Sequence, residues 1–195
     1  MEKWFVSMKK ADFLQIAEKY HISPIIARLI RNREIIGNQD IDYYLNGTIA
    51  DLHDGMLMKN MDTAVEILAE KIREQKKIRV IGDYDIDGVN ATYILKTGLE
   101  SLDAVVDTDI PDRMKDGYGL NEHLIQQAWE DGIDTIITCD NGIAAGSQIQ
   151  KGKELGMTIL VTDHHEVPFR ETEKGREEIL PPADAVVNPK QKECA

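Results

Sequence analysis

The sequence predicts an α/β protein in which helices cover both faces of a parallel β-sheet and a small helical region precedes the sheet. Two observations support this fold class. From residue 78 onward, short apolar runs of strand length alternate with segments of helical periodicity, the pattern of parallel sheets that are covered on both faces. With 195 residues, of which 42% are hydrophobic and 30% charged, the chain is also long enough to bury a core.

The first part of the chain is predicted to be helical. Apolar residues recur at helical spacing over residues 8–45. Within this range, Ser23 followed by Pro24 is typical of a helix cap with proline at the first helical position. Residues 46–55 are expected to form a loop. We therefore expect an N-terminal helical region over residues 1–58.

The second part, residues 59–195, is predicted to form the sheet domain. Its first element is a helix that is capped by Asn60 or Asp62 and has one apolar face. Residues 170–182 are charged, end in two prolines and are predicted to be an exposed loop. The five predicted strands are residues 78–82, 104–108, 135–138, 157–162 and 185–187, with a helical pattern between each of the first four.

Composition restricts the classes of function. A formal net charge of -12 at pH 7 argues against binding nucleic acid through overall electrostatics, because Lys and Arg make most phosphate contacts. Clustered carboxylates that hold divalent cations could still attract a polyanionic substrate locally. Two cysteines, Cys139 and Cys194, are too few for a disulfide framework or a thiolate zinc site. Without a membrane-spanning run or a secretory signal, we expect a cytoplasmic protein with no membrane partner.

Acidic and histidine residues follow the predicted strands. Because ligands bind at the carboxyl ends of parallel strands, residues that follow different strands are expected to meet at one edge of the sheet. This convergence predicts a cation site at that edge. The segments after the five strands are, in chain order, Asp83-Tyr84-Asp85-Ile86-Asp87-Gly88, Asp109-Ile110-Pro111-Asp112-Arg113, Asp140-Asn141-Gly142, Asp163-His164-His165-Glu166 and Asn188-Pro189-Lys190.

The first of these segments carries three acids at alternate positions. In an extended segment Asp83, Asp85 and Asp87 would point the same way and could share a cation. Gly88 permits a tight entry into the following helix. The alternative is that these acids are only turn and helix-capping residues. Acids and histidines after neighbouring strands favour the metal site, since independent caps need not gather at one edge, and we therefore expect Asp140 to be a further ligand.

The Asp-His-His triplet supplies the remaining chemistry. We predict that His164 is a metal ligand, and that His165 binds the scissile phosphate or donates a proton to the leaving oxygen. Asp163 either orients a histidine or reaches a metal itself. Alternatively, both rings have structural roles and bond to backbone groups. Carboxylates mixed with neutral imidazoles suit manganese better than calcium, and magnesium or another transition ion remains open.

Two such ions would stabilise both the attacking and the leaving oxygen of a displacement at phosphorus, so hydrolysis of a phosphoric ester is the predicted reaction class. Arg113 could make a forked contact to phosphate oxygens, or it could pair with Asp112 or Asp116 instead. Tyr118 could stack on a nucleic-acid base or pack beneath its own loop.

Together these motifs resemble the RecJ-type single-stranded-DNA-specific exonucleases of the DHH phosphoesterase superfamily. Their order and spacing match, and the resemblance covers essentially the whole chain. Ile86 and Asn90 differ from the commonest family form, but neither change removes a carboxylate. The matching motifs are Gly82-Asp83-Tyr84-Asp85-Ile86-Asp87-Gly88, Ile110-Pro111-Asp112-Arg113 with Asp116-Gly117-Tyr118-Gly119, Cys139-Asp140-Asn141-Gly142, Val161-Thr162-Asp163-His164-His165-Glu166 and Val187-Asn188-Pro189-Lys190.

The resemblance implies a Rossmann-like DHH domain that holds two manganese or magnesium ions and degrades single-stranded DNA from its 5′ end in repair and recombination. It also implies a longer protein, with a further metal-binding aspartate, a DHH-associated domain and usually an OB-fold. We therefore expect weak metal binding and little or no exonuclease activity from this chain alone. The implied ligands are Asp83, Asp85, Asp87, Asp140 and His164, with His165 near the phosphate.

Two alternatives stay open. A related DHH enzyme could instead cut short oligoribonucleotides or cyclic dinucleotides, although the long N-terminal region and the Gly-Tyr-Gly loop favour the RecJ branch. A non-catalytic DHH-like binding module would have a vestigial metal site, and the retained acids and histidines argue against it. Dinucleotide binding is excluded because no G-x-G-x-x-G sequence follows the first strand.

Overall fold

The computed structural model describes residues 2–5, 9–112, 119–173 and 175–194. The chain forms two compact units, Met1–His53 and Asp54–Ala195. The boundary between them falls a few residues before the predicted end of the helical region at residue 58. Among the described residues, no helix is both long enough and apolar enough to cross a membrane.

The first unit is helical, as its periodicity predicted. Ser23 is the N-cap of the second helix, its side chain accepts a hydrogen bond from the backbone N–H of Ile26, and Pro24 is the first helical residue. Residues 46–55, predicted as a loop, include one short 3-10 helix and the first residue of another. The helices of this region are α1 (Phe13–Tyr20), α2 (Pro24–Asn32), α3 (Asn38–Asn46), η1 (Ile49–Asp51) and, at the start of the second unit, η2 (Gly55–Leu57).

The second unit contains a five-stranded sheet in which every neighbouring pair of strands is parallel, as predicted. Each observed strand lies within a single residue of its predicted range. The strand order is β2-β1-β3-β4-β7. The strands are β1 (Lys77–Ile81), β2 (Val105–Asp109), β3 (Thr135–Cys139), β4 (Thr158–Thr162) and β7 (Ala185–Val187), and the helices are α4 (Met61–Arg73), α5 (Ile86–Glu100), α6 (Glu122–Glu130) and α7 (Gly146–Glu154).

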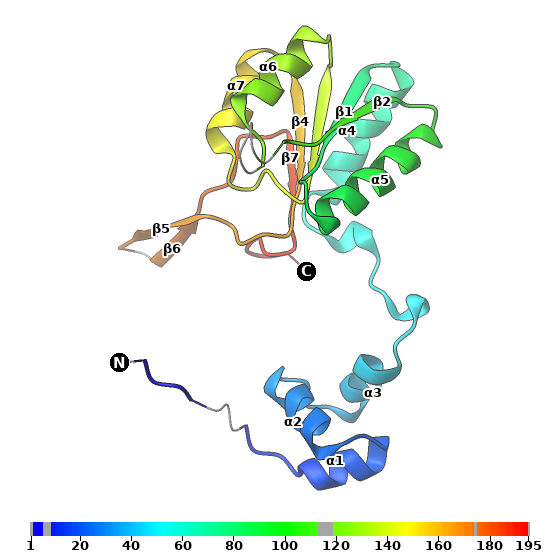
Figure 1. Cartoon of the computed structure of the whole chain (residues 1–195), viewed down its shortest axis with the longest axis vertical. Helices are drawn as coiled ribbons and strands as arrows, with labels where there is room; N and C mark the ends of the chain where they lie inside the picture. The colour runs from blue at the N-terminus through cyan, green and yellow to red at the C-terminus, as the bar shows by residue number, and fades with distance from the viewer. Residues whose placement is uncertain (1, 6–8, 113–118, 174, 195) are drawn as a thin grey trace. The chain divides into compact units, whose positions relative to one another are not determined.

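Helices cover both faces of this sheet (Figure 1). Helices α4 and α5 pack on one face and α6 and α7 on the other. Successive strand residues point to opposite faces, so Ile136 and Ile159 enter the core beneath α6 and α7, whereas Ile137 and Leu160 enter the core beneath α4 and α5. This alternation explains why apolar residues of the central strands β3 and β4 face both sides of the sheet.

The connections reverse direction between β1 and β3. From β1 the chain crosses to β2 on one side, and β3 then lies on the other side of β1. In an open parallel sheet, such a switch point opens a crevice outside the carboxyl ends of the two strands. The fold therefore provides a binding position where the segments after β1 and β3 meet.

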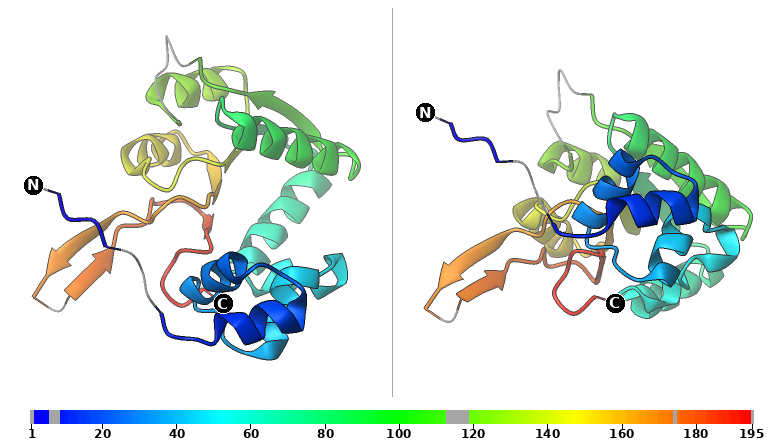
Figure 2. Two further views of the ribbon diagram at one scale, coloured as in Figure 1. Left: turned by 60° about the horizontal axis from the view of Figure 1, so that its bottom comes forward. Right: turned by 90° about the horizontal axis from the view of Figure 1, so that it is seen from below.

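One prediction is wrong: residues 170–182 are not entirely loop. A hairpin of β5 (Phe169–Thr172) and β6 (Gly175–Glu178) occupies much of this range and extends away from the main sheet (Figure 2). Its stabilising contacts include two cross-strand ion pairs, Arg170 with Glu177 at 2.8 Å and Arg176 with Glu171 at 3.1 Å. The sequence lacks the apolar alternation typical of strands because most of the hairpin is exposed.

Candidate metal centre

The loop after β1 leads directly into α5 and contributes two carboxylates. Asp83 is buried at the end of the strand. Asp85 is the N-cap of α5, where its Oδ1 accepts hydrogen bonds from the backbone N–H groups of Asp87 at 2.9 Å and Gly88 at 3.1 Å. The segment is therefore not extended through Asp87, as the alternating acids had suggested, because the helix begins at Ile86.

Gly88 makes this tight entry possible, as predicted. A Cβ atom at this position would lie 2.5 Å from both the backbone N and the backbone O of Asp83. Such contacts are far shorter than van der Waals distances, so any larger residue would push α5 away from the loop. The glycine thus sets the distance between the buried Asp83 and the capping Asp85.

The loop after β3 contributes the most central carboxylate. Asp140 is buried and has a left-handed backbone conformation, with φ of 60°, which aspartate tolerates better than most residues. The next residue, Asn141, donates from Nδ2 to the backbone oxygens of Ile81 and Cys139, each at 3.2 Å. Asn141 therefore ties together the ends of β1 and β3 on either side of the crevice.

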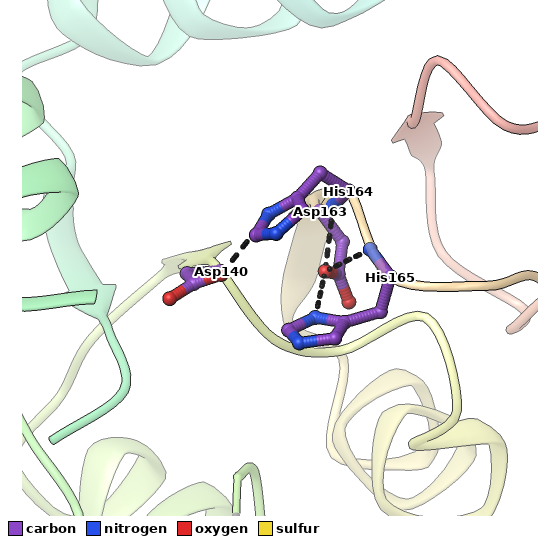
Figure 3. A group of neighbouring side chains, drawn as sticks. All are labelled: Asp140, Asp163, His164 and His165. Atoms are coloured by element: carbon purple, nitrogen blue, oxygen red, sulfur yellow. Dashed lines mark hydrogen bonds and ion pairs between the residues drawn. The ribbon is translucent and has the colours of Figure 1, made fainter. Parts of the chain in front are cut away.

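Asp163, which follows β4, is held almost completely by hydrogen bonds (Figure 3). Its Oδ1 accepts from the backbone N–H groups of His164 at 2.7 Å and His165 at 3.1 Å, and lies 2.8 Å from His165 Nδ1. Its Oδ2 accepts from the backbone N–H of Ile143 at 2.9 Å. Because an ionised carboxylate only accepts, Nδ1 of His165 carries the proton in its contact with Asp163.

These side chains form two groups that could each hold a cation. In each group, one potential ligand atom from every residue lies within 4.8 Å of the others. Asp140 belongs to both groups, so it is placed to bridge two ions. The acidic group consists of Asp83, Asp85 and Asp140, and the histidine group consists of Asp140, Asp163, His164 and His165.

Two predicted site residues do not enter these groups. Asp87 belongs to neither, although it lines a cavity of about 750 Å³ between α4 and α5 whose wall also includes Asp140 and His164. Arg113 lies outside the described residues, as does Tyr118, so their predicted phosphate and base contacts stay predictions.

The electrostatics of the acidic group favour a bound cation. Burial raises the pKa of Asp140, and the negative charge of Asp85 raises it further. For Asp85 the hydrogen bond from the backbone N–H of Gly88 lowers the pKa, so this carboxylate stays ionised. Two carboxylates in contact, one of them buried, repel each other, and a divalent ion between them would remove that repulsion.

In the acidic group, the buried atoms Asp83 Oδ1 and Asp140 Oδ1 have no hydrogen-bond partner among the described residues. The amide oxygens of Asn141 and Gln191 share this property. His164 Nδ1 lies 3.1 Å from Asp140 Oδ1, but the direction of this contact is not that of a hydrogen bond. Buried polar atoms are rarely left unsatisfied, and a metal ion is the partner that two carboxylate oxygens of one cluster would share. The residues present therefore fit a divalent cation.

The imidazole of His165 is also polarised. The hydrogen bond with Asp163 raises the pKa of His165, and this effect outweighs the opposing effect of burial. His165 borders a second cavity of about 270 Å³, which Asn141 and Gln148 also line. Its ring stacks on that of His164 with centroids 4.7 Å apart. His165 thus belongs to the histidine group and also lines the neighbouring cavity.

Sequence reasoning missed the asparagines of this edge. Asn141 and Asn188 make buried side-chain hydrogen bonds to the backbone of neighbouring segments, but no role was predicted for either. Both stood within the motifs, directly after an acid or a strand. Their position at strand ends was the available signal, although asparagine there is equally typical of a turn.

The fold and the two ligand groups together define a member of the DHH family. The profile of the DHH family, N-terminal domain, matches residues 77–195, and the chain belongs to this family. Among its relatives, the single-stranded-DNA-specific exonuclease RecJ of Bacillus subtilis (strain 168) is 38% identical over 193 residues. That alignment covers 98% of this chain but 23% of the RecJ protein, so the chain spans less than a third of the length of this relative.

Solved structures agree with this similarity. A crystal structure of exonuclease RecJ bound to manganese superposes with a TM-score of 0.63 at 33% identity, over 74% of this chain and 34% of that one. RecJ from Thermus thermophilus in complex with Mn2+ also gives a TM-score of 0.63, at 27% identity over 91% of this chain and 23% of that one.

Proposed function

We propose that this chain forms the metal-binding part of a single-stranded-DNA-specific exonuclease that acts in DNA repair and recombination. The observation that carries the proposal is the position of Asp140, which is shared by the acidic group and the histidine group. The RecJ relatives support the choice of substrate, because they match nearly the whole chain. The 5′ to 3′ polarity rests on the resemblance of the motifs.

The acidic group would hold one ion, and Asp140 with His164 would hold a second. When bound, two divalent ions supply an activated water and stabilise the attacking and leaving oxygens at phosphorus. Manganese or magnesium suits this set of carboxylate and imidazole donors. Whether Asp87 is also a ligand is a separate prediction, because it lies outside both groups.

The remaining residues have positioning and proton-transfer roles. The two carboxylate oxygens of Asp163 accept hydrogen bonds from Ile143 and His165. Asp163 would therefore orient His165 rather than act as a metal ligand. The Nε2 atom of His165 would contact the scissile phosphate or give a proton to the leaving oxygen. Arg113, which lies outside the described residues, would bind phosphate oxygens.

The acidic character of the protein is compatible with a DNA substrate. A net charge of -12 opposes binding of a polyanion, but bound cations reverse the sign of the charge at the site. Single-stranded DNA would therefore approach a locally positive centre on an otherwise negative protein. The partners that this function needs are single-stranded DNA and the further domains that its longer relatives possess.

The first test is a calorimetric titration of the metal-free chain with MnCl2. Saturable binding that Asp140→Asn abolishes supports the metal centre, whereas no binding, or equal binding by the variant, contradicts it. The second test compares hydrolysis of 5′-labelled single-stranded DNA, a short oligoribonucleotide and a cyclic dinucleotide by this chain and by a version extended to the length of its relatives. Preference of the extended version for DNA supports the proposal; preference for either other substrate replaces it.

A further inference from the structure

The two histidines lie in a segment without regular secondary structure. We call residues 163–166 the histidine segment; it follows β4 and contains no helix or strand. Catalytic side chains on irregular backbone need other groups to fix their orientation. Asp163 supplies one such connection, because it accepts hydrogen bonds from the backbone N–H and from the ring Nδ1 of His165.

A second connection comes from the neighbouring strand. Asn188 is the first residue after β7, and its side chain is fully buried at 0% exposure. Its Nδ2 donates to the backbone oxygen of His165 at 3.0 Å, and its Oδ1 accepts from the backbone N–H of Lys190 at 2.8 Å. His165 is thus held at its N–H by Asp163 and at its C=O by Asn188.

The sheet register explains why Asn188 reaches this segment. In the parallel pair of β4 and β7, Thr162 lies opposite Val187, and the backbone N–H of Asp163 donates to the oxygen of Val187 at 3.0 Å. Asn188 therefore leaves its strand beside the histidine segment. A second contact, the ion pair of Lys190 with Glu166 at 2.7 Å, links the same two segments at the surface.

The geometry points to Asn188 as a positioning residue that orients His165 for the proposed reaction. This inference rests on the proposed function. With hydrogen bonds at its N–H, its C=O and its ring Nδ1, the rotation of the His165 side chain is restricted. Asn188 does not touch the reacting atoms; it acts through the peptide of His165.

The chemistry of the position requires a primary amide. The side chain must donate to one backbone group and accept from another while fully buried, and asparagine offers both functions on one short side chain. Aspartate keeps the acceptor for Lys190 but loses the donor to His165. Alanine loses both. Loss of a buried hydrogen-bond partner carries a penalty that an exposed one does not.

A purely structural role would be to complete the turn after β7. Gln191 provides a matched control for that role, because it is also a buried amide, at 4% exposure, and lies in the same turn. Its Nε2 donates to the backbone oxygens of Val186 at 2.9 Å and Asn188 at 3.4 Å, so these bonds stay within the β7 segment. Changes at Gln191 should disturb the turn without disturbing His165.

The experiment records ring ¹H–¹⁵N spectra of the histidine-labelled, metal-free chain, which has 5 histidines. The His165 signals are assigned from their absence in His165→Gln. In Asn188→Asp we expect these signals to shift and broaden, while those of His21, His53 and His123 stay in place. In Gln191→Glu we expect the His165 signals to match those of the wild type. Unchanged His165 signals in Asn188→Asp, or equal changes in both variants, would overturn the inference.

If the buried charge of Asn188→Asp prevents folding, as urea unfolding would reveal, Asn188→Ala and Gln191→Ala form the replacement pair with the same expected contrast. In a version of the protein that hydrolyses single-stranded DNA, Asn188→Asp should lower kcat by roughly 10–100-fold, the usual cost of losing an outer partner. That loss should disappear in a His165→Ala background; an undiminished loss there would reject action through His165. If no version hydrolyses DNA, the proposed function fails, and the spectra still decide the orientation of His165.

Discussion

The ionised carboxylate of Asp140 is unfavourable for folding but well placed for binding a cation. Burial and the charge of Asp85 raise its pKa, so keeping it ionised at neutral pH costs folding free energy when no cation is bound. The same ionised carboxylate is the residue that both ligand groups share. This profile is what we expect of a side chain that serves cation binding rather than stability.

The first prediction follows from these two properties of Asp140. Asp140→Asn should lower Mn2+ affinity by at least ~10–100-fold, since loss of even an outer partner costs that much. It should also raise the free energy of unfolding of the metal-free chain at pH 7. The cost is absent below the unfolded pKa of about 3.9, grows between that value and the raised folded pKa, and is fully present above it, so removing the charge helps only at the higher pH.

Calorimetry with MnCl2 and urea unfolding in EDTA at pH 7 and pH 3 measure both effects. The matched control is Asp87→Asn, which removes a nearby carboxylate that lies outside both groups. If Asp87→Asn weakened binding as strongly as Asp140→Asn, Asp87 would be a ligand, as the resemblance implied, and the ligand set drawn from the two groups would be wrong.

At the residue scale, the sequence was informative about acids and less so about amides. Asp83, Asp85, Asp140 and His164 were predicted as ligands from their positions after strands, and the fold brings them together. The alternating acids did not reveal that α5 begins at Ile86, which turns Asp87 away from the extended register. The asparagines were not predicted because their hydrogen bonds join distant segments. Such bonds depend on the order of the strands, which cannot be derived from a single sequence.

At the element scale, the entry into α5 fixes the geometry of the acidic group. Gly88→Ala should destabilise the fold by about 1–3 kcal/mol or more, because the new Cβ would lie 2.5 Å from the backbone of Asp83. Gly98→Ala, in the same helix, has no atom within 4 Å of the new Cβ and should stabilise by about 1 kcal/mol. Urea unfolding of both variants measures the contrast. Similar effects of the two substitutions would show that the close approach at Gly88 does not matter.

A buried arginine links three elements at the opposite end of the sheet. Arg79 in β1 donates to Asp107 in β2 and to Asp131 at the end of α6, at distances of 2.7–2.9 Å. The hydrogen bond from Arg79 lowers the pKa of Asp131, and a second from Gln127 contributes. This network joins the edge strand β2 to the rest of the sheet.

The pH dependence of stability should reflect this ion pair. Because the folded pKa of Asp131 is lowered, its contribution is present above the unfolded pKa of about 3.9 and is lost as pH falls through the folded value. The difference in unfolding free energy between the wild type and Asp131→Asn should therefore shrink from pH 7 toward pH 2. Glu130→Gln is the control, since the contacts of Glu130 include Gln126 but not Arg79. A difference that stays constant with pH would refute the prediction.

Elements were predictable where they are buried and less so where they are exposed. The central strands are buried and rich in apolar residues, so their limits follow closely from composition. The β5–β6 hairpin is exposed and is held in part by ion pairs between its two strands. A charged sequence of this kind is typical of a loop, and the ion pairs become visible only when the pairing of the strands is known. The corresponding signal, opposite charges arranged symmetrically about a turn, is visible only after the hairpin is known.

At the scale of the whole molecule, the two units are joined by an exposed segment. Ile49 and Leu52, between α3 and α4, are 88% and 74% exposed. Thermolysin cleaves before large apolar residues in accessible chain, so we expect its first cuts here, with products close to Met1–His53 and Asp54–Ala195. Mass spectrometry of a short digestion identifies the sites. Initial cleavage within the sheet strands or their covering helices would contradict two independently folded units.

The shared position of Asp140 has a thermodynamic consequence for the whole fold. Asp140 and its partners come from segments that follow three different strands, β1, β3 and β4, so the complete cation site exists only once those strands have assembled in order. A cation that binds the folded state and not the unfolded chain raises the free energy of unfolding. The increase is about 2.7 kcal/mol when the free cation concentration is a hundred times the dissociation constant. The cation supply would then set the unfolding equilibrium of this chain.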